Sequence, residues 1–138
     1  MPPKTFATLS LAALLMSAPG FAELPLKATI PFDFTVGTTR MAAGEYTFTY
    51  SMPGVVRISS PDWKASCLVL TMPVETRKAA ETGKLVFNRY GATHFLSQIW
   101  GPGSGRGREV YKSRAEREMA RNAAGVQRAS VFVKPRHE

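Results

Sequence analysis

Apolar and polar side chains alternate along residues 26–36, and this alternation predicts a β-strand. One parity holds Leu26, Ala28, Ile30, Phe32, Phe34 and Val36, and the other holds Lys27, Thr29, Pro31, Asp33 and Thr35. A strand turns successive side chains to opposite faces, so a period of two places every apolar group on one side. Because a single ribbon of this kind is not stable alone, the stretch predicts a protein in which other strands cover that face.

The same alternation returns in residues 45–50, where three aromatic residues alternate with polar ones. Pro53 and Gly54 follow, and this pair at the central positions predicts a type II turn. Residues 55–60 are then predicted to form a short third strand. Residues 65–74 are apolar on both parities, which predicts a central strand buried on two sides.

A β-hairpin is predicted around Gly91-Ala92, which separates two strand-like runs, residues 85–90 and 94–100. With a two-residue loop, Gly91 takes the first central position of a type II′ turn, and Phe87 lies opposite Leu96. A loop one residue longer would pair Phe87 with Phe95. The sequence favours the tighter loop and leaves the register open.

One helix is predicted, over residues 113–124. Ser113 and Glu116 have the spacing of a capping box, which satisfies free backbone N–H groups at a helix start. Gly125 is a suitable stop in the left-handed conformation. An apolar stripe spaced by four residues would pack on the sheet; it consists of Ala115, Met119 and Ala123.

The remaining segments complete a single-domain prediction. Residues 101–108 are rich in glycine and predict a flexible loop, and residues 126–134 form a last strand. The fold class is therefore all-β, a mainly antiparallel sandwich or open barrel of about seven strands, with one C-terminal α-helix packed on the sheet.

Residues 1–22 have the layout of a secretory signal peptide. A positive start precedes an apolar run over residues 6–16, and small residues at positions 20 and 22 favour cleavage after Ala22. The alternative, an N-terminal membrane anchor, needs an apolar run of about 20 residues. We therefore expect residues 23–138 to form one β-rich domain without a transmembrane span, exported and then periplasmic or extracellular.

Cys67 is the only cysteine, so an internal disulfide is excluded. Its strand-like surroundings favour a buried structural thiol, while intermolecular pairing and a reactive thiol are the alternatives.

Candidate catalytic and metal-binding residues are few. The only histidines are His94 and His137, and no cysteine pair accompanies them, so the ligand set of a zinc site is absent. Asp33 either faces solvent, pairs with a nearby arginine, or forms half of an acid–base pair. Neither a nucleophile elbow nor a phosphate-binding loop occurs. We expect no enzyme activity and no cofactor.

Positive charge is the remaining signal. The chain carries a formal net charge of +8 at pH 7. The candidate polyanion-binding residues are Arg106, Arg108, Lys112, Arg114, Arg117, Arg121 and Arg128. They are either a solvated surface, with local ion pairs to Glu116 and Glu118, or a surface that docks on acidic envelope polymers such as lipopolysaccharide, or on anionic lipid. Nucleic acid is not an expected partner, because it fits poorly with an export signal.

Several motifs together resemble a family. They are Ile-Pro-Phe-Asp-Phe-Thr-Val-Gly at residues 30–37, Ala-Gly-Glu-Tyr at 43–46, Leu-Val-Phe-Asn-Arg-Tyr-Gly at 85–91 followed by Phe-Leu-Ser at 95–97, and Ser-Arg-Ala-Glu-Arg-Glu at 113–118. They are similar to those of uncharacterised small exported β-proteins of environmental bacteria. The resemblance implies an exported β-fold and carries no activity with it.

Three functional hypotheses follow. The leading one is a non-enzymatic exported β-domain that docks on acidic cell-envelope components through its basic C-terminal third. The alternative is a small-ligand carrier with a barrel cavity lined by Phe32, Phe34, Tyr46, Phe48 and Tyr50. The third is a hydrolase that uses Asp33 or His94.

Overall fold

The protein is mostly β-sheet with a single short helix. The structure, a computed structural model, describes residues 25–78 and 82–133; the predicted leader, residues 1–22, lies outside the described residues. The strands are β1 (Leu26–Ile30), β2 (Phe34–Val36), β3 (Thr39–Met41), β4 (Gly44–Met52), β5 (Val55–Ser59), β6 (Ser66–Glu75), β7 (Lys84–Tyr90), β8 (Thr93–Trp100), β9 (Arg106–Val110) and β10 (Gln127–Phe132), and the helix is α2 (Arg114–Asn122).

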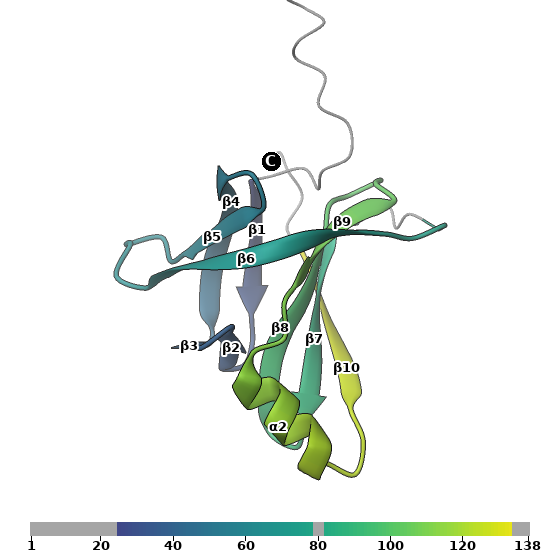
Figure 1. Ribbon diagram of the computed structural model, residues 1–138. Coiled ribbons are helices and arrows are strands. Elements are labelled where there is room, and N and C mark those ends of the chain that lie inside the picture. Colours follow the sequence, from purple (N-terminus) through teal and green to yellow (C-terminus); the bar gives the residue numbers. More distant parts are fainter. Residues whose placement is uncertain (1–24, 79–81, 134–138) are drawn as a thin grey trace, which may run out of the picture.

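The strands form one open sheet that folds over on itself. Its order is β1-β4-β5-β6-β9-β8-β2-β3, with β7 and β10 added beside β8. Every strand pair is antiparallel except β2 with β8. β6 crosses between the half that holds β1, β4 and β5 and the half that holds β7, β8 and β10 (Figure 1). β10 approaches β1 without pairing with it, so the sheet stays open.

The predicted first strand, residues 26–36, divides into β1 and β2. β1 pairs with β4, and β2 pairs with β3 and β8 in the other half of the sheet. Pro31 lies at the break, where it has no N–H for a ladder and a fixed φ that turns the chain. This division, together with the unpredicted short strands β3 and β9, explains why the expected seven strands are ten in the described residues.

The apolar residues predicted to share one face are buried on both sides of that break, in β1 and in β2, and they form part of the core. Phe34 packs edge-to-face on Tyr46 at 5.3 Å and on Phe87 at 5.6 Å between ring centroids. The largest fully buried side chains are Phe34, Phe48, Phe87, Ile30, Ile58, Leu85, Leu96, Ile99 and Val56. Edge-to-face packing of this kind adds to the stabilisation from burial. Because Tyr46 belongs to β4 and Phe87 to β7, the contacts of Phe34 join the two halves of the sheet.

A polar network marks the point where β6 leaves one half and joins the other. β6 pairs with β5 up to Leu70 and with β9 from Thr71 onward. The Thr71 hydroxyl donates to the Gly54 carbonyl at 2.9 Å and accepts from Arg108 Nε at 2.9 Å. Arg108 Nη2 donates to the Thr71 carbonyl at 3.0 Å. Hydrogen bonds of Thr71 thus join β6 both to the β4–β5 turn and to β9.

Both predicted turns are confirmed. Gly54 has φ +82°, as the third position of a type II turn requires. Gly91 has φ +63°, and Tyr90 pairs with Thr93, so the β7–β8 loop has two residues. Phe87 lies opposite Leu96, which is the register of the tighter loop.

Two segments differ from the prediction. Residues 106–108 belong to β9 rather than to a flexible loop; Gly107 is needed there, because a Cβ atom would lie 2.6 Å from the Ile99 carbonyl oxygen. β6 pairs on both edges but is not buried on both faces, since Leu68 and Leu70 are exposed. No helix in the described ranges has the length and hydrophobicity needed to cross a membrane.

Cys67 lies half-buried on the inner face of β6, with its Sγ 3.7 Å from Met41 Sδ. Burial raises the pKa of the Cys67 thiol from 9.0 to about 11. The thiolate is the nucleophile in cysteine reactions, so this environment favours the structural interpretation of Cys67.

We expect Cys67 to react with iodoacetamide at pH 8 about a hundredfold more slowly in the folded protein than in urea, because the thiolate fraction falls tenfold per pKa unit. Time-resolved mass spectrometry of the alkylated chain measures both rates. Equal rates in the two states would show that Cys67 is an accessible, reactive thiol.

Candidate functional site

The helix α2 begins as predicted and ends earlier than predicted. Ser113 is its N-cap, and the Ser113 hydroxyl accepts the Glu116 backbone N–H at 3.1 Å. The helix ends at Asn122, followed by Ala123 in an extended conformation. Gly125 was the expected stop in the left-handed region; that prediction is wrong, because the helix has already ended and Gly125 has no positive φ.

The Glu116 side chain anchors α2 to the sheet. It is buried, and its Oε2 accepts hydrogen bonds from Asn88 Nδ2 at 3.0 Å and from the Tyr90 hydroxyl at 2.9 Å. Both donors lie on β7, on the face that α2 covers. The carboxylate therefore bonds the sheet instead of completing the capping box at Ser113. Burial, then the bond to Glu116, raises the pKa of Tyr90 to about 12.

The apolar stripe predicted for this helix contributes less than expected. Ala115 is exposed, and Met119 and Ala123 are only half-buried. Glu116 is the one helix residue that is buried. The contact is polar because β7 presents an amide and a phenol beneath the helix, and a buried carboxylate satisfied by donors of this kind is stable.

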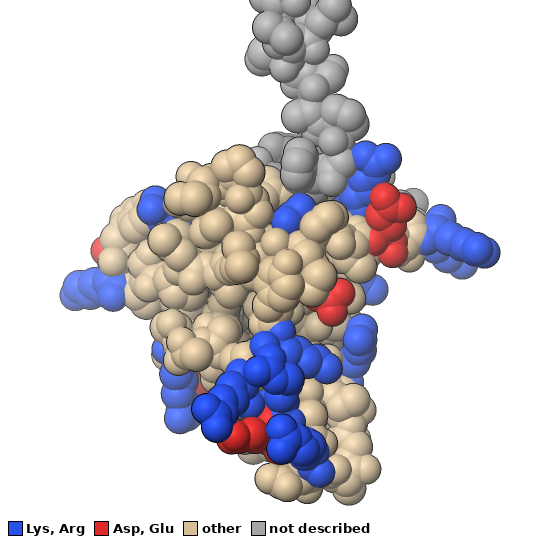
Figure 2. All heavy atoms as spheres, viewed as in Figure 1, with Lys and Arg blue, Asp and Glu red and all other residues tan. Residues whose placement is uncertain are grey.

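With Glu116 turned inward, the opposite side of α2 carries positive charge. We call Arg114, Arg117 and Arg121 of the helix, together with Lys112 just before it, the basic cluster; all are exposed. Arg114 Nε lies 3.4 Å from Glu118 Oε2, and Arg117 Nη1 donates to the Lys112 carbonyl at 2.8 Å. Lys and Arg side chains gather over α2 in Figure 2, so the basic cluster is a contiguous surface.

The other predicted polyanion-binding residues lie elsewhere. Arg108 was expected at the surface; that prediction is wrong, because its guanidinium is buried against Thr71. Arg106 lies on β9 with its Nε 4.0 Å from Glu75 Oε2. Arg128 is exposed on β10, opposite Asn88. A one-dimensional charge run cannot show which arginines a strand turns inward.

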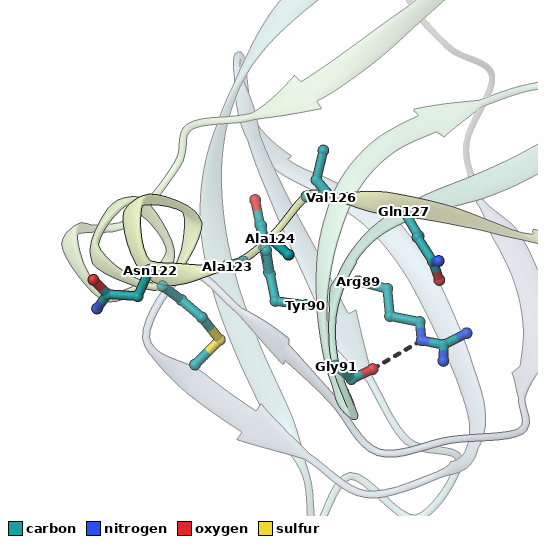
Figure 3. A pocket seen from close by; sticks show the side chains of 10 residues that line it. Arg89, Tyr90, Gly91, Asn122, Ala123, Ala124, Val126 and Gln127 are labelled. Atoms are coloured by element: carbon teal, nitrogen blue, oxygen red, sulfur yellow. Dashed lines mark hydrogen bonds between the residues drawn. The ribbon is translucent and has the colours of Figure 1, made fainter.

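A groove of about 820 Å³ opens between the end of α2 and the β7–β8 turn (Figure 3). Met119 and Asn122 line it from the helix, and Arg89 and Tyr90 line it from β7. The Arg89 side chain lies across the groove from α2 and donates to the Gly91 carbonyl at 2.8 Å. The sequence did not indicate this groove, because residues from distant segments form it.

Asp33, Arg40 and His94 line a small pocket of about 100 Å³. The Asp33 carboxylate accepts the Ala43 N–H at 2.9 Å. It is exposed to solvent and lies 3.9 Å from Arg40 Nη2, which agrees with the expectation that Asp33 faces solvent or pairs with a nearby arginine. His94 stacks on Phe32 at 3.8 Å, and its buried Nδ1 has no hydrogen-bond partner. Among residues 25–78 and 82–133, no carboxylate bonds His94 Nδ1 as an acid–base pair requires, so the hydrolase hypothesis gains no support.

The carrier hypothesis gains none either. Its proposed lining includes Phe34, Tyr46 and Phe48, which are buried and pack among the other core side chains. Within residues 25–78 and 82–133, no group of three His, Cys, Asp or Glu side chains could hold a metal ion. Comparison with protein-family models, curated proteins and solved structures found no match.

Substitution of Glu116 tests the anchor. Glu116→Ala leaves the buried Asn88 amide and Tyr90 hydroxyl without their acceptor, so we expect a loss of about 1–3 kcal/mol in the free energy of unfolding. Glu116→Gln keeps one acceptor oxygen and should lose less. Urea unfolding measures both, and Glu118→Gln on the exposed face is the control. Wild-type stability in Glu116→Ala would contradict this role.

His94 gives the fold a pH dependence. Burial, and then the charge of Arg89, lowers the pKa of His94 from 6.5. The unfolded chain therefore binds a proton that the folded chain does not, and the free energy of unfolding decreases as the pH falls below about 6.5. His94→Phe keeps a ring over Phe32 and removes the titration, so its urea midpoint should depend less on pH in this window. Superimposable pH profiles would refute this.

Proposed function

We propose that this protein is an exported, non-enzymatic β-domain that docks on acidic components of the cell envelope through the basic cluster on α2. The observation that carries the proposal is the arrangement of α2, which buries its Glu116 against β7 and leaves Lys112, Arg114, Arg117 and Arg121 exposed on one surface. Export rests on the signal-peptide pattern of residues 1–22.

The charges of the basic cluster are largely uncompensated within the helix. The Glu116 carboxylate accepts hydrogen bonds from Asn88 and Tyr90 beneath the helix, so it does not form the surface ion pair that helical spacing allows. Within α2, Glu118 pairs with one member of the basic cluster, Arg114, at 3.4 Å. Both side chains are exposed, so this ion pair is weak. The remaining positive charge attracts phosphate and carboxylate groups, and it does so more strongly at low salt.

The anchoring of α2 gives that charge a defined geometry. Hydrogen bonds from Asn88 and Tyr90 hold the first turn of the helix, so its cations are presented on the sheet rather than on a detached segment. A surface held in place loses less conformational entropy on binding than a flexible tail. The basic cluster is therefore better suited to docking than its charge alone indicates.

We expect the purified protein to bind lipopolysaccharide and phosphatidylglycerol vesicles at about 0.01 M salt and to be released at about 0.5 M. The Arg114→Gln/Arg117→Gln/Arg121→Gln variant should bind about a hundredfold more weakly, at about 1 kcal/mol for each cation lost. Co-sedimentation measures both.

The matched control removes the same charge elsewhere, with Lys27→Gln, Arg77→Gln and Lys78→Gln, which are exposed positions outside α2. It should retain most of the binding. The proposal fails if the wild type does not bind at low salt, if salt has no effect, or if the control is weakened as much as the α2 variant.

A further inference from the structure

The outer face of the β5–β6 hairpin exposes apolar side chains that the core does not use. Leu68 and Leu70 are 54% and 57% exposed, and they alternate with the inward-facing residues of β6. Val55 lies directly opposite Leu70, and Met52 adjoins it across the β4–β5 turn. We call Met52, Val55, Trp63, Leu68 and Leu70 the apolar face.

Trp63 is held outward at one end of this face. It is 62% exposed and has φ +61°, a conformation that is rare for a bulky residue. The loop is closed by hydrogen bonds from Ser60 N to the Ala65 carbonyl at 2.9 Å and from Trp63 N to the Ser60 carbonyl at 3.0 Å. Asp62 Oδ1 accepts the Lys64 N–H at 3.0 Å. The fold therefore maintains an exposed indole in a strained backbone position.

Arg57 joins this indole to the rest of the face. Its Cζ lies 6.0 Å from the centroid of the Trp63 ring, and Arg57 is the cross-strand partner of Leu68. Tryptophan with an adjacent arginine suits a boundary that is apolar on one side and charged on the other. A cation therefore lies next to two members of the apolar face, Trp63 and Leu68.

β5 and β6, which carry most of the apolar face, and α2, which carries most of the basic cluster, lie on the side of the molecule that faces the viewer in Figure 1. In the view of Figure 2, the surface over β5 and β6 is mostly uncharged, and the Lys and Arg side chains over α2 lie next to it. We propose that this side binds the surface of an anionic phospholipid bilayer, with the apolar face in the interfacial region and the basic cluster on the lipid phosphates. The inference rests on the proposed function and names its acidic partner.

Charge and chemistry favour a bilayer over other occupants. A soluble acidic polymer offers the basic cluster its anions but offers Leu68, Leu70 and Trp63 no apolar phase. A second copy would bring together two chains of net charge +8 and two copies of Arg57, which repel each other. An anionic bilayer supplies both an apolar phase and negative charge, and tryptophan is enriched at its interface.

The test uses the purified protein and vesicles of phosphatidylglycerol and phosphatidylcholine. We expect the fluorescence of Trp63 to shift to the blue and to be quenched by brominated lipid, whereas Trp63→Phe, which keeps the buried Trp100, shows neither change. Leu68→Thr/Leu70→Thr should bind vesicles about tenfold more weakly, because less apolar area leaves water. Exposed β-strand positions tolerate threonine, so the fold should be retained.

The matched control is Val126→Thr/Phe132→Thr, which changes exposed apolar residues outside the apolar face and should bind like the wild type. If the leucine variant and the Trp63 emission are unchanged while the α2 variant loses binding, the proposed function stands and the bilayer inference fails. A wild-type dimer that dissociates in Leu68→Thr/Leu70→Thr, measured by sedimentation, would also overturn it, because the face would then be an interface between copies.

Discussion

The fold depends on one strand belonging to both halves of the sheet. β6 pairs with β5 through its first half and with β9 through its second, so its path sets the angle at which the halves enclose the core. Thr71 stands at the crossing, and its hydroxyl and backbone groups bond both the Gly54 turn and the buried Arg108 guanidinium. Burying a cation costs free energy unless its N–H donors are satisfied. Thr71 accepts hydrogen bonds from Arg108 Nε and Nη2, so the burial of Arg108 depends on Thr71 lying at this crossing.

This crossing also accounts for the exposed apolar face. The side chains of Leu68 and Leu70 point away from the core, on the half of β6 that pairs with β5. In-sheet pairing with β5 joins this half of β6 at its edge and covers neither face, so the two outward-facing leucines stay exposed. The geometry that completes the core thus leaves apolar surface in solvent, which usually marks an interaction site when the side chains are contiguous.

The attachment of α2 shows how a polar contact can shape a surface. An apolar stripe on the sheet would have left Glu116 outside, where it could pair with a neighbouring arginine. Instead, Asn88 and Tyr90 draw the carboxylate inward, and the exposed side of the helix loses a negative charge. The basic cluster is therefore a consequence of the contact beneath the helix as much as of the number of arginines.

The sequence by itself determined the features that depend on neighbours along the chain. Alternation identified the core parity from Leu26 to Val36, Gly91 identified the hairpin turn, and Ser113 identified the start of the helix, because each is a local property of the backbone and of successive side chains. Only the tertiary structure decided the division of the first strand at Pro31, the strand β9, the burial of Arg108 and the inward turn of Glu116. Each of these depends on a partner distant in sequence, such as Thr71 for Arg108 and Asn88 for Glu116. The sequence shows that a residue is charged, but it does not show whether the fold will place a hydrogen-bond partner beside that residue.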